Sequence, residues 1–263
     1  HKERMMESLF RIDGANIQLN PFAGGPWDKT MEHGGAASSL VVWAAAMIAT
    51  RVPMRIARVT VDLLRPVPVA PLTYKAEIVR EGAKIQLCAV SLFSDGKECL
   101  RASVLKIRVS EAPLPDTAKE KPLDAPLPDD CMKPDDMRLM GTPFLTGVES
   151  RPVRGNFGSP GPAAVWYRAF RPIVEGEGIS PVMRAIIAAD FCNGTSAVVD
   201  FDKWTFINAD LTLSLARYPI GDWVLLDAET WAGPDGAAVA FARLADLHGT
   251  FGRASQSVLL EPR

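Results

Sequence analysis

The stretch SPVMRAIIAADFCNG, residues 180–194, predicts a helix that carries one acidic residue on its buried face. Ser180 followed by Pro181 is typical of a helix start, because serine can cap free N–H groups and proline loses no hydrogen bond there. The apolar residues that follow have the spacing of one buried face: Met183, Ile186, Ile187 and Phe191. Asp190 occupies a position on that same face. Because an unpaired buried carboxylate is costly, we expect Asp190 to be hydrogen-bonded or to face a pocket.

The composition predicts a soluble, globular protein. Of the 263 residues 48% are hydrophobic, and the formal net charge is −2, so the chain offers no basic face for nucleic acid. The longest apolar run, residues 36–49, is shorter than the ~20 residues that cross a bilayer, and no signal-peptide pattern is present. We therefore expect a cytoplasmic protein without a nucleic-acid or membrane partner.

The sequence lacks the usual motifs of metal sites and covalent catalysis. Its cysteines are scattered, with no C-x-x-C pair, at Cys88, Cys99, Cys131 and Cys192. They are expected to be reduced thiols rather than zinc ligands or disulfides. No H-E-x-x-H motif and no G-x-S-x-G elbow occurs either, so we expect no metal, no cofactor and no acyl-serine intermediate.

The first half of the chain predicts one buried helix followed by an antiparallel meander. Residues 36–49 are rich in alanine and apolar nearly all round, which is typical of a helix covered on most sides. From residue 58 to 109 the pattern changes to strands separated by turn signals such as Asp95-Gly96. Residues 111–141 are rich in Pro, Asp and Lys and are predicted to be a linker over the surface.

The second half repeats the first at a separation of 152 positions. The identical residues at this spacing are Ala57/Ala209, Thr60/Thr212, Arg65/Arg217, Glu77/Glu229, Arg101/Arg253, Ala102/Ala254 and Ser103/Ser255. Such a match without gaps across a whole meander indicates a tandem duplication. Since an apolar helix needs a sheet curved around it to leave water, we expect a sheet wrapping a central helix, twice.

This arrangement resembles the double hotdog fold of the acyl-CoA thioesterase II family. The local resemblance lies in the helix that starts at Gly34, in Leu64-Arg65-Pro66, in AVWYRAF at 164–170 and in Ala189-Asp190. The resemblance implies an α+β fold with an N-terminal hotdog at 1–112, a linker at 113–142 and a C-terminal hotdog at 143–263. It also implies hydrolysis of an acyl-CoA thioester to a carboxylic acid and free CoA.

In that family an Asp, a Thr and a Gln orient and activate the attacking water. The resemblance places Asp190, Asn208 and Gln256 in these positions, so that Asn208 departs from the family pattern by lacking the hydroxyl. Gln256 alternates with apolar residues along its predicted strand, whereas Asn208 alternates with polar residues, so its face could be exposed to solvent. Gly34 and Gly35, at a helix N-terminus, would let the substrate carbonyl approach closely, although a plain turn explains them almost as well.

Two other functions remain open at this point. One is a catalytically silent acyl-CoA-binding protein, because Asn208 replaces the reactive hydroxyl. The other is a hotdog hydratase, but that chemistry needs an Asp–His pair, and the predicted second helix has no histidine near Asp190; His33 is interpreted as a loop residue. Exposed sheet edges favour a homodimer or a higher homo-oligomer.

Overall fold

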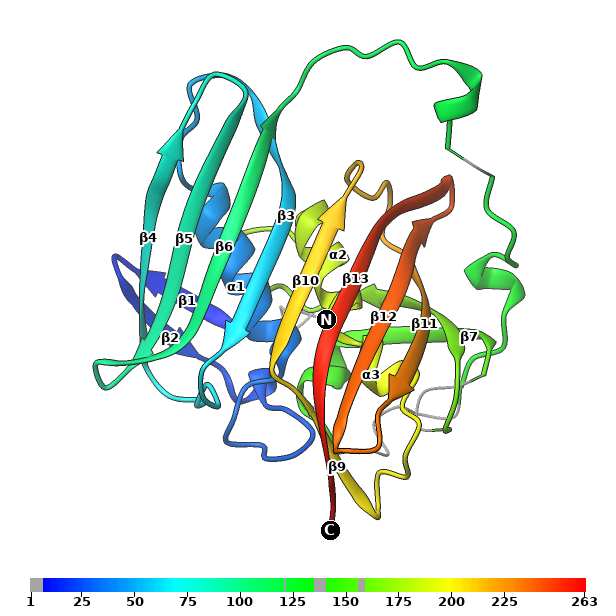
Figure 1. Ribbon diagram of the computed structural model, residues 1–263. Coiled ribbons are helices and arrows are strands. Elements are labelled where there is room, and N and C mark those ends of the chain that lie inside the picture. Colours follow the sequence, from blue (N-terminus) through cyan, green and yellow to red (C-terminus); the bar gives the residue numbers. More distant parts are fainter. Residues whose placement is uncertain (1–6, 121, 135–140, 156–158) are drawn as a thin grey trace, which may run out of the picture.

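The computed structural model describes residues 7–120, 122–134, 141–155 and 159–263 (Figure 1). The α-helices are α1 (Gly34–Ala46), α2 (Pro181–Asp190) and α3 (Cys192–Thr195), and short 3-10 helices lie at Pro21–Ala23, Asp116–Ala118, Pro128–Asp130 and Phe144–Gly147. The strands are β1 (Phe10–Asp13), β2 (Asn16–Leu19), β3 (Met54–Leu63), β4 (Leu72–Glu81), β5 (Ile85–Ser94), β6 (Lys97–Arg108), β7 (Val148–Arg154), β8 (Ala163–Ala169), β9 (Trp204–Asn208), β10 (Asp210–Leu215), β11 (Val224–Ala232), β12 (Ala237–Asp246) and β13 (Gly249–Pro262).

Helix α1 is covered on nearly every side, as its alanine-rich sequence predicted. Every residue from Gly35 to Ala45 is buried, and the helix packs against strands β3, β5 and β6 and against α2. The small side chains of its first six residues, Gly34 to Ser39, allow neighbouring elements to approach its backbone closely. The meander predicted for residues 58–109 is confirmed as strands β3 to β6.

Helix α2 begins where the sequence predicted but is shorter than the predicted stretch, and Cys192–Thr195 form a separate helix, α3. Ser180 is its N-cap and accepts a hydrogen bond from the Met183 N–H, with Pro181 in the first turn. The apolar positions of the predicted face are buried, and α2 packs on strands β8, β10, β11, β12 and β13. The helix ends at Asp190, which therefore lies at its C-terminal end and beside α1.

All the strands belong to one antiparallel sheet in the order β1-β2-β4-β5-β6-β3-β10-β13-β12-β11-β8-β7, with β9 paired to β13. The two halves join where β3 pairs with β10 and Thr60 lies opposite Thr212. On either side of this pair lie Ser103 of β6 and Ser255 of β13. The repeated residues thus form a Ser-Thr-Thr-Ser row across the junction, which relates the halves by an approximate two-fold axis.

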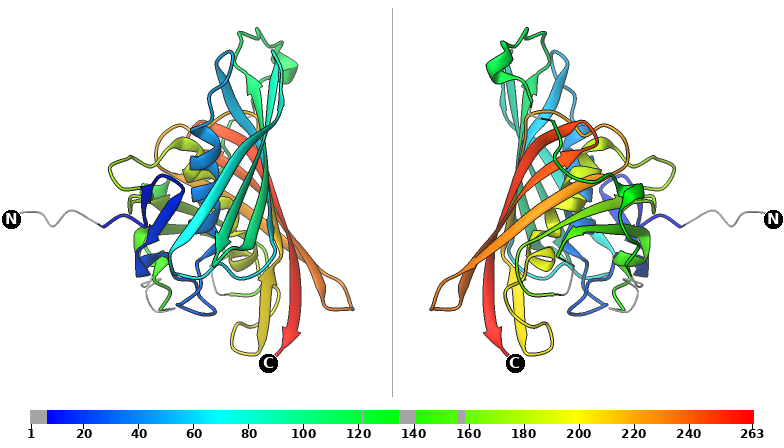
Figure 2. Two further views of the ribbon diagram at one scale, coloured as in Figure 1. Left: turned by 90° about the vertical axis from the view of Figure 1, so that its left-hand side faces the viewer. Right: turned by 90° about the vertical axis from the view of Figure 1, so that its right-hand side faces the viewer.

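The helices lie on one face of the sheet and leave the other face open (Figure 2). The segment between the halves runs over the surface, and its Leu123, Ala125 and Cys131 pack on a small apolar cluster of the second half. Residue 121 and residues 135–140 of the predicted linker lie outside the described residues. In the described part of the chain, no helix combines the length and apolarity that crossing a membrane requires.

Candidate active site

A cavity of 610 Å³ lies between the two halves, at the N-terminus of α1 and the C-terminal end of α2. Its walls come from the loop before α1, the end of β3, the α2–α3 segment and strand β9. Aromatic side chains line one side, where Trp27 stacks on Phe201 at 4.7 Å and meets Phe206 edge-on at 5.1 Å. The walls are otherwise largely apolar, so the few polar groups that face the cavity determine what it can bind.

Asp190 is the polar group at the centre of this cavity wall. Its side chain is only 6% exposed, and burial raises the pKa of the carboxyl from its ordinary value to about 7, an effect that the Gly35 N–H partly opposes. The carboxyl lies directly against α1, because a Cβ on Gly34 would stand 2.5 Å from Asp190 Oδ1. Only glycine permits this approach, because any side chain at position 34 would collide with the carboxyl. A plain turn would not by itself require a glycine there.

His33 belongs to the same site, although it lies in the loop before α1, as the sequence indicated. It caps α1, its Nδ1 accepts a hydrogen bond from the Gly35 N–H at 3.0 Å, and Nδ1 lies 3.2 Å from Asp190 Oδ2. Stacking on Phe144 at 4.5 Å fixes the ring. Burial lowers the pKa of His33 to about 3, so the imidazole is neutral at physiological pH. An acid–base pair between the two halves results.

Gln256 lies behind Asp190 rather than on the cavity wall. The side chain is buried: its Oε1 accepts from the Asn193 N–H at 2.9 Å, and its Nε2 donates to the Asp190 backbone oxygen at 3.2 Å. These bonds tie β13 to the turn between α2 and α3. Asn208 does line the cavity, and its Nδ2 donates to the Asp210 backbone oxygen at 3.1 Å.

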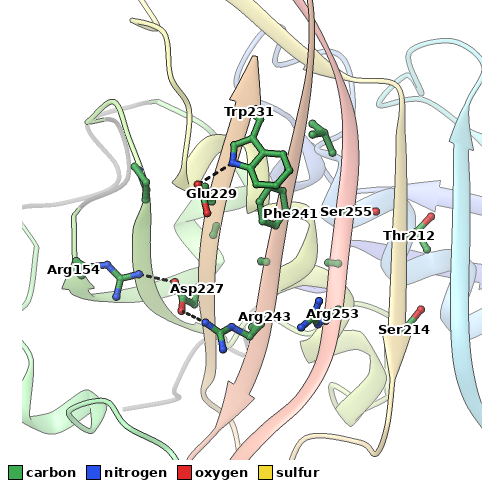
Figure 3. Close-up of a pocket in the computed structure, with 15 residues that line it drawn as sticks. Arg154, Thr212, Ser214, Asp227, Glu229, Trp231, Phe241, Arg243, Arg253 and Ser255 are labelled. Carbon is green, nitrogen blue, oxygen red and sulfur yellow. Dashed lines mark hydrogen bonds and ion pairs between the residues drawn. The ribbon is translucent and has the colours of Figure 1, made fainter. Parts of the chain in front are cut away.

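A second hollow, of 810 Å³, lies on the open face of the sheet and has a different character (Figure 3). Several of its polar side chains interact with one another: Arg154 donates to Asp227 at 2.6 Å, Arg243 lies 3.9 Å from the same carboxylate, and the Trp231 indole donates to Glu229 at 2.9 Å. None of the residues predicted for the active site lies there. The cavity between the halves is therefore the candidate site.

Family models match both halves of the chain. The acyl-CoA thioesterase N-terminal domain matches residues 23–107, and the acyl-CoA thioesterase C-terminal domain matches residues 117–260. The chain belongs to the acyl-CoA thioesterase family. The predicted resemblance to this family is thus confirmed, whereas a comparison with curated protein sequences finds no match.

Solved structures show the hotdog fold expected of an acyl-CoA thioesterase family member. The chain is similar to a hotdog-fold protein from Alicyclobacillus acidocaldarius, with TM-score 0.77, 15% identity and coverage of 96% of this chain and 95% of that one. It is also similar to the TesB protein of Mycobacterium avium subspecies paratuberculosis, with TM-score 0.67, 16% identity and coverage of 96% of this chain and 95% of that one. A third similar structure is acyl-CoA thioesterase II TesB2 of Mycobacterium marinum, with TM-score 0.67, 16% identity and coverage of 98% of this chain and 96% of that one.

Two polar residues of this candidate site were not predicted from the sequence. They are His33, which the sequence presents only as a loop residue, and Glu32, which also lines the cavity. The signal that could have found them is their position immediately before Gly34-Gly35, since residues just before a buried helix N-terminus must lie beside whatever that helix faces. Among the described residues, no group of three acidic, histidine or cysteine side chains is placed to hold a metal ion.

Proposed function

We propose that the protein hydrolyses acyl-CoA thioesters by direct attack of a water molecule that Asp190 activates. The observation that carries this proposal is the buried carboxyl of Asp190, which lies against the N-terminus of α1 in the wall of a mostly apolar cavity. A base whose pKa lies near 7 is matched to proton abstraction at neutral pH. The cavity volume and its apolar walls suit an acyl chain, and Arg65 at its wall offers a positive charge to the phosphates of CoA.

In the proposed reaction the thioester carbonyl lies at the start of α1. The Gly34 N–H has no acceptor within the helix, because the first N–H groups of a helix never do, and it can donate to the oxyanion. Ionised Asp190 takes a proton from water while the water oxygen bonds to the carbonyl carbon. When the C–S bond breaks, Asp190 returns the proton to the CoA sulfur, which gives the free thiol and the carboxylic acid.

His33, Asn208 and Gln256 have distinct roles in this proposal. Neutral His33 is a positioning residue, because its Nδ1 accepts from the Gly35 N–H and lies 3.2 Å from Asp190 Oδ2, which holds the start of α1 beside the carboxyl. Asn208, on the cavity wall, positions the attacking water through its amide. Gln256 is a positioning residue, because it holds the backbone at Asp190 and Asn193. This role differs from direct contact with the water, which the family resemblance implied.

We also propose a double hotdog arrangement with the N-terminal unit at residues 1–112, a linker at 113–142 and the C-terminal unit at 143–263. The packing of α1 on β3, β5 and β6, and of α2 on β8 and β10 to β13, supports it. The ends of the described sheet, at β1 and β7, offer edges for pairing. A homodimer or a higher homo-oligomer remains our expectation.

The direct test is release of free CoA, followed with a thiol-reactive dye, from a panel of short, medium, long and aromatic acyl-CoA thioesters. We expect turnover of at least one chain length without added metal or cofactor. No release from any member, together with measurable binding of acyl-CoA, would favour the catalytically silent binding protein instead. The distances between Asp190, His33 and Gly34 would then need another explanation.

One observation favours a second candidate, the addition of water to an enoyl-CoA. That reaction uses an Asp–His pair, and the structure supplies one, with Asp190 on α2 and His33 before α1 only 3.2 Å apart. The water oxygen would bond to C3 of the acyl chain and a proton would be delivered to C2. Loss of the enoyl absorbance without release of CoA would identify this activity.

The pH dependence of hydrolysis follows from the pKa of Asp190. The base must be ionised, so we expect kcat/KM to rise with pH and to level off above a midpoint near 7. About a tenth of the limiting rate should remain one pH unit below the midpoint. His33 is neutral over this whole range and adds no second limb. Initial rates between pH 5 and 9 in buffers of constant ionic strength measure this; a flat profile would contradict the assignment of Asp190 as the base.

A further inference from the structure

Glu32 is a buried carboxyl group for which the hydrolytic mechanism has no use. It lines the cavity between the halves, and both of its carboxyl oxygens are buried without a hydrogen-bond partner among the described residues. Burial raises the pKa of Glu32 well above its usual range, which favours the neutral acid. A buried polar group without a partner is costly, so its presence at a ligand cavity calls for a partner supplied by the ligand.

The backbone holds Glu32 firmly in this position. Its N–H donates to the Val67 backbone oxygen at 2.7 Å, and it forms a bridge with Gly24 on its other side. The next residue, His33, is fixed by capping α1 and by stacking on Phe144. Because both neighbouring segments are tied down, the backbone of Glu32 is held at the cavity wall.

Asp28 provides a contrast within the same cavity. It is also acidic and lines the wall, but its carboxylate accepts from both the N–H and the hydroxyl of Thr30, at 2.8 and 2.6 Å. Asp28 therefore has its hydrogen bonds within the protein. Glu32 does not, and this difference distinguishes a satisfied wall residue from one that recognises a ligand.

We propose that Glu32 determines substrate specificity by hydrogen-bonding a neutral oxygen substituent, a hydroxyl or keto group, on the acyl chain. This inference rests on the proposed thioesterase function and names the substrate class, oxygenated acyl-CoA thioesters. A neutral carboxyl both donates and accepts, so it can serve either substituent. When an unsubstituted acyl chain is bound, the carboxyl of Glu32 has no hydrogen-bond partner in the part of the protein that the structure describes, because the surrounding wall is apolar. A site of this kind discriminates strongly against substrates that lack the oxygen.

The chain places this contact close to the reacting carbonyl. Glu32 is two residues from Gly34, so their Cα atoms lie within ~7 Å of each other, and Gly34 touches Asp190. The oxygen that Glu32 recognises therefore belongs to one of the first few carbons of the acyl chain. A substituent near the far end of a long chain would not reach it.

The test uses pairs of substrates that differ only in this oxygen. CoA release is measured for butanoyl- and hexanoyl-CoA and for their 3-hydroxy and 3-oxo derivatives, with wild type, Glu32→Gln, Glu32→Leu and the control Asp28→Asn. Wild type is expected to prefer an oxygenated member by about tenfold to hundredfold in kcat/KM. Glu32→Leu should bring the ratio near one, chiefly through KM. Glu32→Gln should keep part of the preference, and Asp28→Asn should leave the ratio as it is.

Either of two results would overturn the inference: a wild-type ratio near one for every pair, or an undiminished ratio in Glu32→Leu. Both would leave the thioesterase proposal intact, since turnover would still be seen. If wild type hydrolyses no thioester, the proposed function fails instead. The role of Glu32 is then tested by calorimetric binding of non-hydrolysable thioether analogues of the same pairs. If wild type binds the oxygenated analogue more tightly and Glu32→Leu loses this preference, the inference is supported. If wild type binds both analogues equally, the inference is rejected.

Discussion

Replacing Asp190 by Asn is expected to lower kcat for thioester hydrolysis by about 10² to 10⁴-fold, the usual contribution of a general base. The amide has the same shape and fits the same place beside His33, whose Nδ1 lies 3.2 Å from the carboxyl. It cannot take a proton from water, however. Because the change affects the chemical step and leaves the cavity walls in place, KM should stay within a few-fold of wild type. Steady-state CoA release with the preferred acyl-CoA measures both constants.

The matched control for this variant is Asp235→Asn. Asp235 is exposed in the turn between β11 and β12, away from the cavity, so the same chemical change there should leave kcat unaffected. Full activity of Asp190→Asn would remove Asp190 from the role of base. A loss of activity together with loss of the folded structure, measured by circular dichroism, would show a structural effect instead; the isosteric amide is chosen to avoid that effect.

The fold could be predicted from the sequence largely because its signals are local. The cap at Ser180 and the apolar face depend on spacings of a few residues, and α2 has both, although it ends at Asp190. The spacing of 152 positions also predicted the duplication. How the halves join was not predictable. The identity of Thr60 and Thr212 follows from the duplication, and no local sequence pattern indicates that these two residues pair with each other across the junction.

The active site could be predicted only in part, for a related physical reason. Asp190 stood out because a carboxylate on an apolar face violates the helical pattern. His33 and Glu32 lie in a loop, where no periodicity exists to violate. Their significance comes from a contact with Asp190 across 157 positions and from an absent hydrogen-bond partner. Only the three-dimensional structure contains these two facts.

The same Asp190→Asn variant is expected to be more stable than wild type at high pH. The pKa of Asp190 is about 7 in the folded protein, above the ordinary value of 3.8, so the folded state holds its proton more tightly than the unfolded state does. Ionisation of Asp190 therefore destabilises the fold progressively as the pH rises from about 4 to 7. Between pH 5 and pH 8 the advantage of the variant in free energy of unfolding should grow by roughly 2–3 kcal/mol.

Urea denaturation of both proteins at pH 5 and pH 8 measures this change. All other groups, including Glu32, titrate in both proteins, so their effects cancel when the two differences are compared. An advantage that stays constant with pH would mean that the carboxyl of Asp190 is not strained by burial, and the pH profile of hydrolysis should then lose its midpoint near 7 as well. If the stability difference and the rate of hydrolysis instead both change with pH around 7, one ionisation explains both. The protein then retains a carboxylate at Asp190 that destabilises the fold because that carboxylate is the base.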